Sequence, residues 1–225
     1  MGGIPENNLK EKELTRKEKN EEILKKEGVK INFSLPHIET DEETILRTSE
    51  EIARRLTVLA VTNLTAFDAI DPEEAIDYLK NCDLWEHTTP AEKDFLTEPT
   101  EQKKAQESWK CECIWVLLWA LKKVDTLPFP DELCDLNDIP AENYPVGGDI
   151  DPNDFINAPH ELRSKSEILD AADLYYRYDW ACVDARINNI EMTTVDPGIV
   201  YERHYALNWL ITYMDQDWDD VSCDT

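Results

Sequence analysis

One stretch of the chain is apolar on every side. All nine residues from Cys113 to Leu121 are apolar, and tryptophans stand at positions 109, 115 and 119. A helix without a polar face is a buried helix, so the pattern predicts a core helix over Trp109–Leu121 around which the other helices pack. The apolar run is shorter than the roughly 20 residues that a bilayer span needs, and lysines flank it on both sides.

Signals for helix starts recur along the rest of the chain. Capping boxes, in which two side chains each satisfy the other residue's backbone N–H, are spelled by Thr40/Glu43, Thr89/Glu92 and Ser164/Glu167. Four Asp-Pro or Thr-Pro pairs, one of them again at Thr89, place a cap residue before a proline at the first helical position. Together the signals predict helices that begin near residues 40, 71, 89, 101, 151, 164 and 196.

The predicted fold class follows from these starts. The helix that begins near residue 40 is expected to bury one face, made of Ile45, Ile52, Leu56 and Leu59. Nowhere are two alternating apolar runs joined by a turn. The chain is therefore predicted to be all-α, a multi-helical globular domain around the buried central helix.

The first 35 residues are predicted to form two different elements. Residues 9–27 are nearly all charged or amidic, which is typical of a solvated helix laced with opposite charges. Gly28 ends this helix, so residues 1–28 are interpreted as a charged helical extension. Val29, Ile31, Phe33 and Leu35 then alternate with polar residues, which predicts one extended segment.

Residues 29–225 are predicted to form a single helical domain with one long acidic loop. Residues 125–160 are rich in proline and glycine, and residues 131–160 hold eight acids and no lysine or arginine. No domain boundary is placed in this loop, because the helices expected after residues 164 and 196 carry apolar faces that the first half must cover. Loops of this length in a compact domain are functional or mobile.

The charge of the chain excludes some classes of partner. Lys and Arg number 23 against 49 Asp and Glu, a net charge of -26, and the first 28 residues carry seven of each sign. The acidic surplus therefore lies on the globular part. Such a surface repels phosphate, so we expect no nucleic acid and no membrane as partners, and a basic protein as the one that it suits. Solubility alone also explains an acidic surface.

Six cysteines are present, but their spacing matches no zinc-ligand motif and no CxxC pair. The N-terminus lacks the basic and apolar regions of a signal peptide. These features favour reduced thiols in the cytoplasm over a disulfide framework.

Several stretches combine aromatic and charged residues, and they supply a candidate polar cluster. Its members are Glu112, Arg163, Asp173, Arg177, Glu202, Arg203 and His204. Glu112 adjoins the apolar run, where an ionised carboxylate needs a partner. We expect that partner to be Arg163, Arg177 or Arg203, in an internal ion pair.

Six stretches resemble a known family. They are residues 47–55, 109–121, 162–164, 173–180, 202–210 and 218–225. Together they resemble the bacterial family known as domain of unknown function 4272, over a length from about Ile23 to the last residue. The resemblance implies a cytosolic helical bacterial domain without an assigned activity, and it assigns no catalytic residue.

Three functional hypotheses remain open. The first is a non-enzymatic acidic protein-binding domain, of which an antitoxin-like protein that masks a basic enzyme is one form. The second is an enzyme that acts on a small molecule through a buried Glu/Arg/Asp cluster. A purely structural domain is a third. Because Glu-x-x-His pairs, a complete calcium loop and a glycine-rich phosphate loop are missing, we expect no metal and no cofactor.

Overall fold

The computed structural model describes residues 14–148 and 151–225, and over these residues the fold is all-α, without any strand, as predicted. The α-helices are α1 (Arg16–Glu27), α2 (Ser49–Ala66), α3 (Pro72–Asn81), α4 (Pro90–Thr97), α5 (Glu101–Ser108), α6 (Cys111–Ala120), α7 (Pro152–Asn157), α8 (Lys165–Ile187) and α9 (Pro197–Leu210). Short 3-10 helices are η1 (Trp85–His87), η2 (Leu136–Asp138), η3 (Ala141–Asn143), η4 (Tyr213–Asp215) and η5 (Trp218–Asp220).

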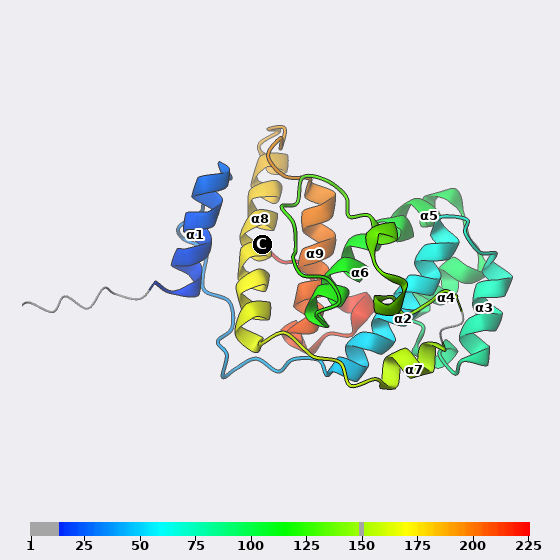
Figure 1. Cartoon of the computed structure of the whole chain (residues 1–225). Coiled ribbons are helices and arrows are strands. Elements are labelled where there is room, and N and C mark those ends of the chain that lie inside the picture. Colours follow the sequence, from blue (N-terminus) through cyan, green and yellow to red (C-terminus); the bar gives the residue numbers. More distant parts are fainter. Residues whose placement is uncertain (1–13, 149–150) are drawn as a thin grey trace, which may run out of the picture.

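The helices form a row that runs across the molecule. In Figure 1, α1 stands at one end, followed by α8, α9, α6 and α2, with α3, α4, α5 and α7 gathered at the other end. Neighbours in this row pack against each other, most extensively α8 against α9 and α6 against α9. None of the described helices combines the length and the apolarity that crossing a membrane requires.

The predicted core helix is confirmed, and it shares the centre of the fold with α2. In α6, Cys113, Ile114 and the run from Val116 to Leu118 are fully buried, and the helix packs between α9 and α2. Helix α2 is also buried on nearly every side, and it joins two apolar clusters. One cluster lies toward α6, α8 and α9, and the other lies toward α3, α4 and α7. The arginines and threonines of α2 concealed this second central helix in the sequence.

The helix start predicted at residue 40 is wrong. Thr40 and Glu43 do form the reciprocal hydrogen bonds of a capping box, but these close a turn. The helix begins only at Ser49, where Thr48 and Glu51 form a second box. A short helix needs a buried apolar face to support it, but Ile45, the residue expected to begin that face, is 74% exposed. The other predicted starts each precede a helix of the structure.

Helix α1 is less solvated than its charge predicts. It begins at a capping box of Thr15 and Glu18 and ends at Gly28, whose φ of 75° suits a residue without a side chain. Leu24 and Asn20 are buried where α1 packs on α8. The described part of the charged extension is therefore docked on the domain along one face, and residues 1–13 lie outside the described part of the chain.

The extended segment predicted over residues 29–35 is interrupted by a turn at Phe33 and Ser34, which the N–H of Leu35 closes by donating to the carbonyl of Asn32. Val29 and Leu35 are buried, whereas Phe33 at the same alternation is 71% exposed, and none of these residues forms a strand with the rest of the described chain. Within its described residues, the acidic loop contains only the short elements η2, η3 and α7. Its first part is anchored on α9, because the backbone N–H of Asp196 donates to the carbonyl of Pro130.

Candidate functional site

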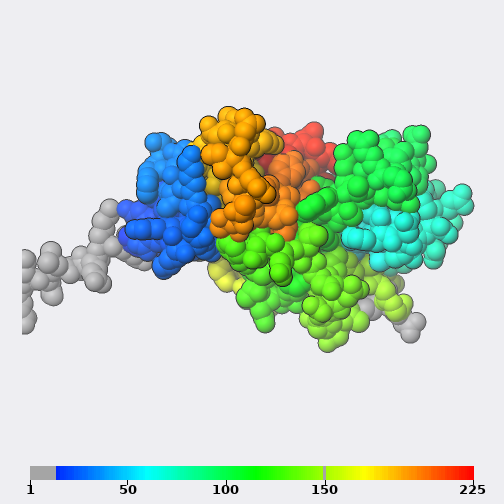
Figure 2. Space-filling view, turned by 90° about the horizontal axis from the view of Figure 1, so that it is seen from above, coloured from blue at the N-terminus to red at the C-terminus, as the bar shows by residue number. Residues whose placement is uncertain are grey.

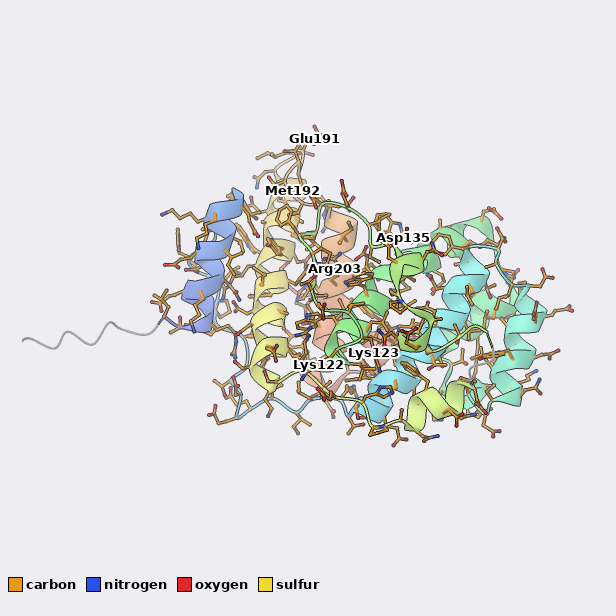
Figure 3. The ribbon with its side chains drawn as sticks, in the orientation of Figure 1. Lys122, Lys123, Asp135, Glu191, Met192 and Arg203 are labelled. Atoms are coloured by element: carbon orange, nitrogen blue, oxygen red, sulfur yellow. The ribbon has the colours of Figure 1, made fainter. Side chains whose placement is uncertain are left out.

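Glu112 and Arg203 form an ion pair in the centre of the protein. The Nε of Arg203 on α9 donates to Oε2 of Glu112 on α6 over 2.7 Å, and neither side chain is exposed at all. Nη1 of Arg203 also donates to the hydroxyl of Tyr175 and to the carbonyl of Pro128. Burial opposes the charge of Arg203, but Tyr175 and Glu112 outweigh it and raise the guanidinium pKa. Of the three arginines that the sequence offers for Glu112, Arg203 is the partner, and Figure 3 shows it on α9.

Asp173 and Arg177 form a second buried pair, one turn apart on α8. Nε and Nη2 of Arg177 each donate to one carboxylate oxygen of Asp173, over 2.8 and 2.7 Å. Asn20 of α1 donates to the same carboxylate over 2.8 Å. A bidentate arginine fixes the orientation of the carboxylate. The pair therefore secures α1 to α8.

Arg163 binds backbone and not the central carboxylates. Its guanidinium donates to the carbonyl oxygens of Trp119, Val124 and Asp125, at the end of α6, and it lies over the Trp119 ring. Glu167 is its ion-pair partner, over 3.1 Å. Arg163 thus stabilises the turn after α6.

Glu202 and His204 belong to two further clusters. Glu202 accepts from Nζ of Lys110 over 2.9 Å and from the thiol of Cys113 over 3.2 Å. His204 lies 3.2 Å from the carboxylate of Asp179. Burial opposes a charged Lys110, but Cys113 and Glu202 prevail and raise its pKa well above the usual value.

The seven candidate residues therefore do not converge on one site. Glu202, Arg203 and His204 are consecutive on α9, where successive side chains point about 100° apart. They meet three different sets of neighbours. The structure places the candidate residues in four separate internal clusters and beside the backbone turn that Arg163 binds.

A cleft that the sequence did not indicate lies beside Glu202. We call it the Lys110 cleft; it has a volume of about 320 Å³ and is lined by Ala91, Glu92, Gln106, Glu107, Trp109, Lys110, Glu202, Tyr205, Trp218 and Asp219. Within the described residues, the Glu107 carboxylate forms no ion pair or side-chain hydrogen bond. Burial, opposed by Lys110 and reinforced by Glu92 and Glu202, raises the pKa of Glu107 to about 7. A carboxyl group with that pKa exchanges protons near neutrality.

A larger cleft adjoins the first one and shares Trp218 and Asp219 with it. Its volume is about 710 Å³, and its walls combine α2, η1, the start of α4 and the C-terminal segment. Arg55 lies over the Trp218 ring there and forms a buried ion pair with Glu92. Burial and the nearby charges of Arg54 and Arg55 lower the pKa of His87 at the rim. Residues from three parts of the chain, 47–55, 86–90 and 209–220, thus meet in space although they lie far apart in the sequence.

No curated protein and no solved structure matches the chain. One family model does match, and it covers residues 16–221, almost the whole chain. The chain therefore belongs to the family described as Domain of unknown function (DUF4272).

Proposed function

We propose that this protein is an acidic protein-binding domain that recruits a basic protein partner through the first part of the 125–160 loop. The observation that carries this proposal is a set of five exposed carboxylates, the loop acids Asp131, Glu132, Asp135, Asp138 and Glu142. None of them forms an ion pair in the part of the chain that the structure describes. Figure 2 shows this segment, in green to yellow-green, along the lower edge of the molecule.

The internal clusters support binding over catalysis. Glu112 and Asp173, two carboxylates of the candidate polar cluster, are fully buried and form ion pairs with arginines. A carboxylate that already accepts from a guanidinium in the core has no access to a substrate. The five loop carboxylates, which form no ion pair among the described residues, are instead exposed to solvent, where they attract cations.

The partner that fits is a protein with a basic surface. An antitoxin-like role, in which the loop acids mask a basic enzyme, is one concrete form of this function. Steering between opposite charges is screened over a Debye length of about 8 Å at physiological salt, so association should slow as ionic strength rises. All six cysteines are free thiols, which supports a reducing compartment such as the cytoplasm.

Affinity capture from the cytosol of the native host, at low and at high salt, tests the proposal. The test variant changes all five loop acids to the corresponding amides. Its matched control changes five exposed acids around α3 that also lack ion pairs among the described residues, namely Asp71, Glu73, Glu74, Asp77 and Asp83. The wild type and the α3 control should retain one basic protein at low salt, and the loop variant should lose it. Equal recovery by the loop variant, or no basic protein at either salt, would refute the proposal.

A second function, an enzyme acting on a small molecule, is favoured by one observation. Glu107 faces the Lys110 cleft without a partner and has a pKa of about 7, the range that suits a general acid or base. A thermal-shift screen of small metabolites tests this function. A ligand that stabilises the wild type but neither Glu107→Gln nor Lys110→Met would support the enzyme, and a screen without such a ligand would count against it.

A further inference from the structure

The fold brings two cysteines and a glutamate together where the acidic loop crosses the start of α6. Cys111 and Glu112 are the first two residues of α6, and Cys134 comes from the loop more than 20 residues later. The two Sγ atoms and a carboxylate oxygen of Glu112 all lie within 4.8 Å of one another. No local spacing motif in the sequence indicates this group, because only the tertiary fold brings Cys134 close to Cys111 and Glu112.

Several contacts hold the three groups in place. The backbone N–H of Cys134 donates to Oε1 of Glu112 over 2.7 Å, and the Cys134 thiol donates to the carbonyl of Cys111 over 3.4 Å. Arg203 donates to the other oxygen of Glu112. Since each carboxylate oxygen has two lone pairs, Glu112 keeps acceptor capacity toward the thiols. Donors behind a carboxylate ligand orient it in the way that outer-shell partners do at metal sites.

We propose that Cys111, Cys134 and Glu112 bind a thiophilic divalent metal ion, with Zn²⁺ as the ion that suits them best. Thiolate sulfur selects zinc over magnesium or calcium, and two sulfurs with one carboxylate oxygen are an accepted zinc donor set. A solvent molecule completes a tetrahedral site at the half-buried side of Cys134, which also provides an entry path.

The charges of the group balance with such an ion. Binding replaces the two thiol protons, which leave to solvent, so that two thiolates and Glu112 carry three negative charges. Zn²⁺ and the Arg203 guanidinium supply three positive charges, and no net charge is buried.

Bound metal would also join the acidic loop to the core. Cys134 stands beside the loop acids Glu132 and Asp135, whereas Cys111 and Glu112 belong to α6. The loop would then be fixed on one side by the metal and on the other by the bond from Asp196 to Pro130. This effect does not depend on what the loop binds.

Metal titration of the full chain, kept reduced with a phosphine, tests the site. The affinity for Zn²⁺ is measured in competition with a chromophoric chelator. The protons released on binding are measured in weakly buffered solution, and Co²⁺ binding is followed by its thiolate-to-cobalt charge-transfer absorption. Cys134→Ser is the main variant because it lies at the half-buried position, and Cys111→Ser is the second. Cys182→Ser is the control, since it removes a buried thiol on α8 outside the group.

The wild type and Cys182→Ser should bind one ion per chain and release two protons with it. Cys134→Ser should bind at least about tenfold more weakly and show a weaker charge-transfer band, because only the Cys111 thiolate remains, while its thermal melt without metal stays close to that of the wild type. Equal binding by Cys134→Ser and the wild type, or absence of binding by the wild type, would overturn the proposal.

Discussion

Replacing Glu112 by glutamine should destabilise the fold strongly. The substitution keeps the shape of the side chain but removes its charge, and it turns one acceptor oxygen into an NH₂ donor. Oε1 accepts from the backbone of Cys134 and Oε2 accepts from Arg203, so the new NH₂ group must face one of these donors. A hydrogen bond is lost, and the guanidinium loses its anion.

The magnitude follows from the burial of Arg203. Its side chain has no exposed surface, so water cannot replace the missing carboxylate. The bonds to Tyr175 and Pro128 remain, but both acceptors are neutral. Removing one partner of a buried pair costs about 3–5 kcal/mol, a large part of the roughly 5–15 kcal/mol that stabilises a typical protein.

Urea denaturation of the wild type and Glu112→Gln measures this cost. With an m-value of about 3 kcal/mol per M, the midpoint should fall by about 1 to 1.7 M. Glu50→Gln is the matched control, because Glu50 pairs with Arg54 at the surface, where it is 57% exposed, and should cost less than about 1 kcal/mol. The double variant Glu112→Leu/Arg203→Met should be more stable than either single change. If Glu112→Gln were as stable as the wild type, the pair would not be structural and the reasoning would fail.

Three further predictions concern the pH dependence, the start of α2 and the packing of α9. The pKa of Glu107, about 7, lies above its usual 4.5, so the folded state binds a proton that the unfolded state has released. The free energy of unfolding, measured in urea, should therefore fall between pH 4.5 and 7, and Glu107→Gln should flatten this fall. Parallel plots of stability against pH for the wild type and the variant would contradict the raised pKa. Thr48→Ala should lower the free energy of unfolding by about 1 kcal/mol, because it removes the N-cap of α2. Thr40→Ala affects only a turn and should lower it by less. Equal losses of stability in urea would argue against the helix start at Ser49. Gly198→Ala should cost about 1–3 kcal/mol, because its Cβ would lie 2.7 Å from the Trp109 ring, and an unchanged melting temperature would exclude that close contact.

Local signals in the sequence were sufficient for most of the fold. A capping box or a proline at the first helical position acts within four residues, so Thr89, Ser164 and Asp196 indicate helix starts without any knowledge of the tertiary structure. The uniform apolarity of α6 likewise predicts its burial. The same local reasoning fails at Thr40, because its capping box forms but Ile45 in the segment that follows stays exposed and a turn forms in place of a helix.

The polar clusters could be predicted only in part from the sequence, because their members come from different helices. The position of Glu112 next to an apolar run predicts a buried arginine partner. The sequence offers three arginines, and only the packing of α6 on α9 shows that the partner is Arg203. Glu107 gave no indication in the sequence, because its raised pKa depends first on burial and then on charges that the tertiary fold brings near it, among them Glu92 and Glu202. Cys134 gave none either, because its neighbours in space come from a helix that precedes the loop.

Helix α9 shows why the charged residues of this family member are distributed as they are. The helix is buried from Glu202 to Leu210, so its polar residues cannot point to solvent and each requires a partner inside. Glu202 pairs with Lys110 just before α6, Arg203 pairs with Glu112 on α6, and His204 pairs with Asp179 on α8. The three pairs connect α9 to the start of α6 in two places and to α8 in one. A shift of α9 by one turn, about 5.4 Å, would separate all three pairs at once and leave several buried charges unpaired. The three pairs therefore select one register for the central helices, which apolar packing alone would specify less sharply.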